Sequence, residues 1–416
     1  AVSQIQLSKD DSGLLKKLQK IHDEYQPDVI IAVNTYPSFI ASRLNSLAPL
    51  WADLNGWIMA EAQAQAYKMN SNDYLWHYTE MEDLILRRAD KFSTVSEAQK
   101  FAVLGELASI GRLCAESFGY EFCEVVRNGI EWFEEEREAW MIAKNNNAHV
   151  STYLAQTELD VKNSEESKSL YGHTLDDLFK AVPGNAFTLL WIGGYNTWVD
   201  EVTLFKGVQS AMQSCENLYF VSTGGEISGL DNKTFANFKL MIDGSAFKDR
   251  FVFLGWVDTK MIPYVYGRAD VGLNVDKLCV ETLTGARNRI NEMMKFGLPV
   301  ITTLGSEISY EVVRVGAGVG VVSGREDFLS EAIVKMWREA GGRTSGGSGG
   351  NFANYGKKGQ EYIEKYCNYL VTLKPLLKWL ESPVVAPDRG IVTSRGGAWR
   401  GGLKYLHENG VGKFLK

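Results

Sequence analysis

Two stretches in the second half of the chain carry residue types that bind anions. One is a glycine pair after an apolar run, and the other holds two arginines between two glutamates: Gly193-Gly194, and Glu281, Arg287, Arg289 and Glu292. Backbone N–H groups in a glycine turn approach a phosphate closely, and guanidinium groups neutralise its charge. These residues predict a site for a phosphate-bearing ligand. The glycine spacing is not Gly-x-Gly-x-x-Gly, which disfavours a nicotinamide cofactor.

The arginines belong to a stretch whose pattern predicts a polar loop, a short helix and a buried strand. The helix should run to about Phe296, because Gly297 and Pro299 are stop signals, and an apolar strand should begin at Val300. At about 100° per residue, one helix face is apolar and predicts core, and the opposite face is polar and predicts a wall around a ligand. The apolar face comprises Ala286, Ile290, Met293 and Met294, and the polar face Gly285, Asn288, Arg289 and Glu292.

Apolar runs alternate with helical patterns along most of the chain. This alternation predicts an α/β fold of doubly wound parallel sheets, in which ligands bind at the loops that precede helices. In the first domain, strands are expected at 29–33, within 49–56, within 89–97 and at 122–126. In the second domain, five strands spaced by helices are expected, the first at 187–192 and the fifth around 300, and a late helix and strand follow over 310–322.

The stretch from Glu292 to Val300, Glu-Met-Met-Lys-Phe-Gly-Leu-Pro-Val, resembles the donor-site motif of retaining family-4 glycosyltransferases, the glycosyl transferases group 1. The resemblance implies two Rossmann-like domains (GT-B) and transfer of a sugar from a nucleoside-diphosphate sugar to a glycan, lipid-linked or other acceptor, with retention. It implies no cofactor besides the nucleotide-sugar co-substrate. It also implies a cytoplasmic bacterial enzyme of polysaccharide biosynthesis. No metal cluster of the Asp-x-Asp kind stands out in the sequence, which predicts independence of a metal.

The resemblance assigns Glu292 to the ribose of the donor; the alternative is a solvated helix residue. A second family Glu, near the sugar, falls at Thr284, where the closest carboxylate is Glu281. The family's loop Arg and Lys are absent after the glycine pair, so we expect Arg287 and Arg289 to supply the positive charge for catalysis; the alternative is two surface arginines. The predicted donor-binding residues are Gly193, Gly194, Asn196, Trp256, Glu281, Thr284, Gly285, Ala286, Asn288 and Glu292. Trp256 is expected either to stack on the base or to lie in the core.

On the acceptor side, the stretch 49–56 is expected to be a strand that opens into the cleft between domains. Asp53 and Asn55 are the catalytic candidates there, and the alternative is a simple Asn-Gly turn. Ser96 is expected to cap the following helix.

The predicted domains are an acceptor-side domain over 1–182, a nucleotide-sugar-binding domain over 183–354 and a helix over 355–383 that crosses back to the first domain. A basic tail or linker follows over 384–416, with peripheral membrane contact as one interpretation. The family usually has about three strands before the first strand found here, so we expect the first domain to be truncated at its N-terminus.

The formal net charge of −7 gives the chain no footprint for nucleic acid, and no apolar run approaches the length of a membrane span. The five cysteines lack metal-type spacing, which is typical of reduced thiols in the cytoplasm. Two other functions stay open: a sugar-nucleotide epimerase of the same fold, and a sugar-nucleotide-binding protein with weak or no catalysis.

Overall fold

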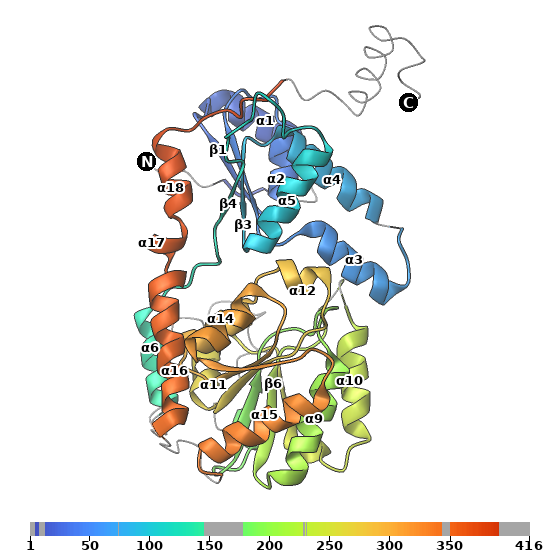
Figure 1. The fold of residues 1–416 in the computed structure, drawn as a ribbon, viewed down its shortest axis with the longest axis vertical. Coiled ribbons are helices and arrows are strands. Elements are labelled where there is room, and N and C mark those ends of the chain that lie inside the picture. The colour runs from blue at the N-terminus through green and yellow to red at the C-terminus, as the bar shows by residue number, and fades with distance from the viewer. Residues whose placement is uncertain are drawn as a thin grey trace, which may run out of the picture. The chain divides into compact units, whose positions relative to one another are not determined.

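The computed structural model describes residues 5–7, 13–73, 75–144, 178–227, 229, 231–342 and 350–390. They form two compact units, each built on its own parallel sheet with flanking helices (Figure 1). This confirms the predicted α/β class with two Rossmann-like domains. Unit 1 comprises Ala1–Met59, Asn72–Val126 and Pro375–Lys416, and unit 2 comprises Ala60–Ser71 and Arg127–Lys374.

Unit 1 has the strand order β1-β2-β3-β4, with all neighbours parallel. The strands are β1 (Ile30–Val33), β2 (Leu50–Leu54), β3 (Lys91–Thr94) and β4 (Cys123–Val125), and the helices α1 (Leu14–Tyr25), α2 (Thr35–Ser42), α4 (Leu75–Arg88), α5 (Glu97–Ser109) and α18 (Lys374–Glu381). Leu50, Ala52 and Leu54 of β2 enter the core, while Trp51 packs edge-on against Trp379 of α18 at 5.3 Å between ring centroids. Both faces of the sheet are therefore covered, as parallel sheets require. Ser96 caps α5 as predicted, accepting a hydrogen bond from the Gln99 N–H.

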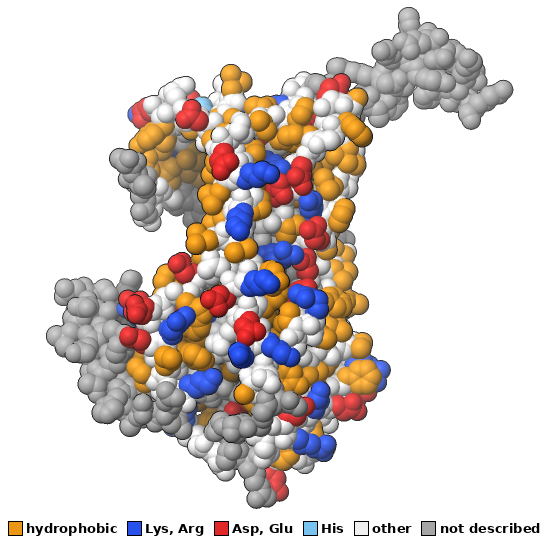
Figure 2. Space-filling view, turned by 60° about the vertical axis from the view of Figure 1, so that its left-hand side comes forward, with side chains coloured by type: hydrophobic (Ala, Val, Ile, Leu, Met, Phe, Trp, Pro, Cys, Tyr) orange, Lys and Arg blue, Asp and Glu red, His pale blue; other side chains and the backbone are white. Residues whose placement is uncertain are grey.

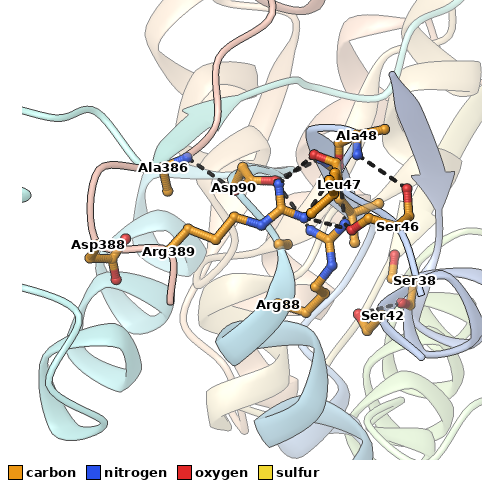
Figure 3. A network of polar contacts seen from close by, with 12 residues as sticks. Ser38, Ser42, Ser46, Leu47, Ala48, Arg88, Asp90, Ala386, Asp388 and Arg389 are labelled. Atoms are coloured by element: carbon orange, nitrogen blue, oxygen red, sulfur yellow. Dashed lines mark hydrogen bonds and ion pairs between the residues drawn. The ribbon is translucent and has the colours of Figure 1, made fainter. Parts of the chain in front are cut away.

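The chain returns to unit 1 after α18. Asp388 is wholly buried, and the Arg112 guanidinium binds it through two hydrogen bonds of 2.7 and 2.9 Å. The Ala386 N–H donates to the Asp90 carboxylate at 3.0 Å (Figure 3). The segment 384–390, predicted as the start of a tail, is thus part of this unit.

Unit 2 has six parallel strands in the order β10-β9-β8-β5-β6-β7. The strands are β5 (Phe187–Trp191), β6 (Leu218–Thr223), β7 (Phe251–Gly255), β8 (Val271–Asn274), β9 (Val300–Thr303) and β10 (Gly318–Val321). Side chains alternate between two cores: Phe187, Leu189 and Trp191 of β5 enter one, and Leu190 enters the other.

Helices cover each face of this sheet (Figure 1). One core is closed by α9 (Glu201–Ser214), α10 (Lys233–Asp243) and α15 (Glu326–Glu339), and the other by α6 (Glu134–Lys144), α11 (Ile262–Gly267), α13 (Asn288–Lys295) and α14 (Glu307–Val315). The further elements of the described chain are α3 (Ile58–Met69), α12 (Val280–Thr284), α16 (Gly350–Tyr362), the π-helix Ile363–Cys367, α17 (Tyr369–Thr372) and the 3-10 turns Lys248–Arg250 and Thr259–Met261.

The units divide the chain at Val126/Arg127 and Lys374/Pro375, rather than at the predicted 182/183 and 354/355. The reason lies in aromatic packing within unit 2. Trp132 and Trp140 contact Phe296 with ring centroids 5.1 and 6.5 Å apart, so the segment that carries α6 packs with the later sheet. Residues 391–416 of the predicted tail lie outside the described residues.

Acidic and basic side chains are interspersed on the face seen in Figure 2, rather than gathered by sign. Across the part of the chain that the structure describes, no helix combines the length and the apolar character needed to cross a bilayer.

Candidate functional site

The glycine pair follows β5 at the carboxyl edge of the unit 2 sheet. Gly193 has φ +92°, a left-handed conformation that favours glycine. A Cβ on the neighbouring Gly224 would lie 2.4 Å from the Gly193 carbonyl oxygen, so the close approach of the loops after β5 and β6 requires glycine at position 224. The Gly193 N–H, predicted to face a ligand, instead donates to Thr223 Oγ1 at 3.2 Å. The Gly194 N–H has no acceptor among the described residues.

Arg289 lies beside this glycine loop. Its Nε donates to the Ile192 carbonyl at 2.5 Å and its Nη2 to the Gly194 carbonyl at 3.1 Å. The guanidinium carbon lies 3.7 Å from the centroid of the Trp191 ring, which holds it by cation–π contact. Burial lowers the pKa of Arg289 to about 10, so the group keeps its charge at neutral pH. No carboxylate of the described ranges forms an ion pair with it.

Arg287 has a different environment, although it lies only two residues earlier. Its Nε donates to Asp276 at 2.6 Å, and its two terminal nitrogens donate to Glu281 at 3.1 and 2.6 Å. Burial alone would lower the pKa of Arg287, but the two carboxylates raise it above its ordinary value. Arg287 is 5 % exposed, so the alternative of a surface arginine is wrong for it, and its charge is neutralised inside the protein.

The helix α13 presents an uncapped N-terminus. No side chain caps it, and the N–H groups of Asn288 and Arg289 have no acceptor within the described chain. Unsatisfied N–H groups and the helix dipole attract anions at such an end. The helix stops as predicted at Gly297 (φ +65°), where the Leu298 N–H returns to the Met293 carbonyl at 2.9 Å. The predicted core residues Ile290, Met293 and Met294 are fully buried.

Glu292 lies one turn along α13. Its side chain is 37 % exposed, and the Lys295 Nζ is 4.0 Å from its carboxylate. Burial raises the pKa of Glu292, and Lys295 opposes that shift. The residue is therefore half-buried rather than fully solvated.

The predicted polar loop before α13 contains the short helix α12. Thr284 is buried, and its hydroxyl donates to the Val280 carbonyl at 2.8 Å. Gly285 donates its N–H to the Glu281 carbonyl, and a Cβ there would lie 2.6 Å from Glu281 Oε1. Only glycine fits beside this carboxylate, and the Gly285 amide, expected at the ligand, is used internally. The Ala286 N–H has no acceptor in the described ranges.

Trp256 and Asn196 complete the predicted donor set. Trp256 is 58 % exposed, so the alternative that it lies in the core is wrong. A Cβ on Gly194 would lie 3.5 Å from its ring, which places the indole next to the glycine loop. Asn196 lies on the same loop and accepts the Val199 N–H at its carbonyl.

The acceptor candidates lie in unit 1, apart from the donor set of unit 2. Asp53, near the end of β2, pairs in register with Ser93 of β3, whose hydroxyl donates to the carboxylate at 2.5 Å. Burial raises the pKa of Asp53, and Ser93 opposes that shift. Asn55 is exposed and precedes Gly56 at φ +102°, which is the predicted turn.

Sequence reasoning missed a carboxyl group of unit 2. Glu61 belongs to the segment 60–71, which clusters with unit 2 although the strands on either side belong to unit 1. Burial raises the pKa of Glu61 to about 7, with Glu281 adding to the shift and Arg287 opposing it. One feature could have drawn attention to it: Glu61 is the single acidic residue in the helical stretch 57–70.

Within the described residues, no three His, Cys, Asp or Glu side chains are arranged to hold a metal ion. No family model matches the chain, and no curated protein matches it.

Solved structures do match. HepE of Anabaena, in complex with UDP and glucose, is 16 % identical with a TM-score of 0.58, over 91 % of this chain and 84 % of that one. Sucrose-phosphate synthase of Thermosynechococcus elongatus is 14 % identical with a TM-score of 0.58, over 89 % and 78 %. The trehalose-6-phosphate protein of E. coli bound with UDP-2-fluoro glucose is 13 % identical with a TM-score of 0.60, over 89 % and 77 %. These likenesses show that the chain has the GT-B fold of these glycosyltransferases.

Proposed function

We propose that the chain is a glycosyltransferase that moves a sugar from a nucleoside-diphosphate sugar to a hydroxyl group of a glycan or lipid-linked acceptor. The observation that carries the proposal is the environment of Arg289. Its guanidinium group binds two carbonyl groups and no carboxylate of the described chain, and it lies beside the Gly194 amide and the uncapped N-terminus of α13. An un-neutralised cation next to free N–H groups is suited to a diphosphate. The similar structures with UDP or a UDP-sugar make UDP the first nucleotide to test.

In this proposal the diphosphate, the ribose and the base of the sugar donor are bound by different residues. Arg289, the Gly194 and Ala286 amides and the first turn of α13 bind the diphosphate, and the half-buried Glu292 carboxylate accepts hydrogen bonds from ribose hydroxyls. The exposed Trp256 ring stacks on the base. As the anomeric bond breaks, negative charge grows on the leaving diphosphate, so the cation and amides stabilise the transition state more than the bound donor.

Arg287 takes a positioning role rather than the direct role expected from the sequence. Arg287 stands at the start of α13 and binds both Asp276, which follows β8, and Glu281 of α12. The cluster thereby fixes the backbone that aims the α13 N–H groups.

On the acceptor side, Asp53 and Asn55 bind the acceptor hydroxyl. Retention of configuration, which the family resemblance implies, and independence of a metal, which the sequence pattern predicts, are part of the proposal.

The test compares Arg289→Ala with Arg314→Ala. Arg314 is an exposed arginine of α14 that pairs with Glu311, so its variant controls for loss of a charge in the same unit. Thermal shift with UDP, GDP, ADP and dTDP identifies the nucleotide, because a bound ligand stabilises the native state. We expect Arg289→Ala to weaken binding of that nucleotide by about ten- to a hundred-fold, as loss of a charged hydrogen bond does. Equal affinities of the two variants would remove Arg289 from the site.

One observation favours a second candidate, a sugar-nucleotide-binding protein without transfer. Thr284 places a hydroxyl group, bound to its own helix, where the family resemblance expects a carboxylate. Incubation of the chain with a bound donor separates the candidates: transfer to an acceptor, or slow hydrolysis of the donor, supports the enzyme. An altered sugar nucleotide formed without acceptor indicates the epimerase, and an unchanged donor indicates the binding protein.

A further inference from the structure

The segment 60–71 is anchored along the carboxyl edge of the unit 2 sheet. Lys68 Nζ lies 3.4 Å from a Glu201 carboxylate oxygen, and both side chains are largely buried. The other oxygen of Glu201 binds Lys277 at 2.7 Å, and Lys233 donates to the Lys68 carbonyl at 3.4 Å. Glu201 and Lys233 are the first residues of α9 and α10, which follow β5 and β6. The segment therefore lies where ligands of parallel sheets bind.

Glu61 shares the helix face of Lys68. The two residues are seven positions apart on α3, and at about 100° per residue they point the same way. Because Lys68 faces unit 2, Glu61 does so as well. Its carboxyl group lies within electrostatic reach of Glu281 and Arg287.

The carboxyl groups of this region differ in whether they have an ion-pair partner. Arg287 neutralises both Asp276 and Glu281, each of which is almost fully buried. Glu61 has neither an ion pair nor a hydrogen bond with any residue of the described ranges. It is also only partly buried. Thr284 offers nothing equivalent, since its hydroxyl donates to the Val280 carbonyl.

We propose that Glu61 binds hydroxyl groups of the transferred sugar and so distinguishes a nucleotide sugar from the bare nucleotide. The inference rests on the proposed function and deepens it. A carboxylate accepts hydrogen bonds from two neighbouring hydroxyls, and such charged bonds are stronger than neutral ones. The segment 60–71 thus contributes a specificity residue to a site that the rest of unit 2 builds for the diphosphate.

Titration of Glu61 gives the proposal a second readout. Glu281 and Arg287 lie within electrostatic reach of Glu61, and Arg287 also binds Asp276. Lys68, further along the helix, pairs with Glu201, which also binds Lys277. The pKa of Glu61 is raised to about 7, so the group ionises across neutral pH. Its strength as a hydrogen-bond acceptor for the hydroxyl groups of a nucleotide sugar should rise with ionisation.

The experiment measures affinities for UDP and for UDP-glucose by calorimetry, or for the diphosphate and glucose conjugate of whichever nucleotide binds. The full chain is compared with Glu61→Ala and Glu61→Gln. Gln63→Ala is the matched control, because Gln63 is an exposed residue of the same helix. We expect Glu61→Ala to weaken nucleotide-sugar binding by about ten-fold or more and to leave nucleotide binding unchanged. Glu61→Gln should recover part of the loss.

The nucleotide-sugar affinity of wild type should rise between about pH 6 and about pH 8 relative to that of Glu61→Gln, whose side chain does not ionise. The nucleotide sugar suits this comparison because both of its phosphates are esterified, whereas the terminal phosphate of a bare nucleoside diphosphate itself titrates at about pH 6. Normal nucleotide-sugar affinity in Glu61→Ala, with nucleotide binding intact, overturns this inference and leaves the proposed function standing. Failure of every nucleoside diphosphate to bind the wild-type chain overturns both. Circular dichroism of each variant shows that the comparison is made between folded proteins.

Discussion

At the scale of single residues, the site depends on the partners of Arg287 and Arg289. Arg287 is held by two carboxylates, so removing it would leave two buried negative charges close together. Arg289 is held by two carbonyl groups and an indole ring, which orient its charge without cancelling it. The first arrangement serves the fold, and the second leaves a charge for a ligand.

Arg287→Ala should therefore lower stability more than it lowers nucleotide affinity. Breaking a buried ion pair on one side costs about 3–5 kcal/mol, because the remaining charges are left uncompensated. Urea unfolding measures the loss, with Arg314→Ala as the exposed control, for which little loss is expected because exposed ion pairs contribute little. The deficit should grow as pH rises, because burial raises the pKa of Glu281 and this carboxyl group then ionises without its cation. A deficit as small as that of the control would contradict the buried cluster.

At the scale of elements, α4 and α5 of unit 1 meet through a pair of carboxyl groups. Glu82 of α4 is 4 % exposed, and Glu106 of α5 lies within electrostatic reach of it. Glu82 Oε2, Glu106 Oε2 and Trp57 Nε1 are buried without a hydrogen-bond partner among the described residues. A buried carboxyl group beside a second one resists ionisation, so Glu82 keeps its proton more readily than an ordinary glutamate does. Burial raises the pKa of Glu82 well above its ordinary value, with Glu106 adding to the shift.

This pair makes the stability of unit 1 depend on pH with a definite sign. The native state holds the Glu82 proton more tightly than the unfolded chain does. The stabilisation is thus complete below the ordinary glutamate pKa and is lost as pH rises through the native pKa. Glu82→Gln needs no proton, so the stability advantage of wild type over this variant should shrink as pH rises from about 4.3, the ordinary glutamate pKa, into the alkaline range. Thermal unfolding across this range is the measurement, and Glu80→Gln, an exposed change on the same helix, should follow wild type.

Parallel curves for wild type and Glu82→Gln would show that Glu82 holds no extra proton in the native state. Carbon-13 labelling of the glutamate carboxyl groups gives an independent check, since Glu82 should titrate well above the ordinary glutamate pKa.

Local patterns predicted the elements, because their causes are local. The helix α13 and its stop at Gly297 depend on residues within one turn of each other, and the structure confirms them. Aspartates before two strands act alike: Asp90 binds the Leu50 N–H at 2.8 Å, and Asp270 binds the Thr188 N–H at 2.7 Å. Each follows Arg-Ala in the sequence and aligns the first residues of two adjacent strands.

The partners of charged side chains were not predictable in the same way. Nothing in the spacing of Asp276, Glu281 and Arg287 indicates an ion cluster, because the loop between β8 and α13 has no repeating geometry. The position of Glu61 depends on the segment 60–71 packing with unit 2 while the flanking segments belong to unit 1, and this packing is tertiary structure that local patterns do not predict. Donor residues were therefore identified by type, but their partners required the structure.

At the scale of the molecule, the chain ends its described course in the unit where it began. Within unit 1, Arg389 donates to the carbonyl groups of residues 46–48, and both Arg88 and Arg389 contact Asp90 (Figure 3). The Arg112–Asp388 pair joins two residues that are 276 positions apart, and both are buried. The final segment thus completes the core of unit 1.

This arrangement sets where the basic tail begins for an experiment on membranes. A chain that ends at residue 390 keeps the buried pair, and a chain that ends at 383 leaves Arg112 without Asp388. We expect the first truncation to unfold like the full chain, and the second to be destabilised by about 3–5 kcal/mol, as for a broken buried pair. Asp388→Asn in the full chain should reproduce much of that loss.

Residues 391–416 contain five Lys or Arg against one Glu, together with Trp399 and Leu403, a composition suited to an anionic bilayer. Co-sedimentation with phosphatidylserine vesicles should therefore pellet the full chain and not the chain that ends at 390. Raised salt should reduce the pelleting, because attraction between exposed charges is screened. Equal pelleting of the two chains would show that residues 391–416 do not bind the membrane. The comparison is sound only at residue 390, because a cut at 383 changes the fold and the tail together.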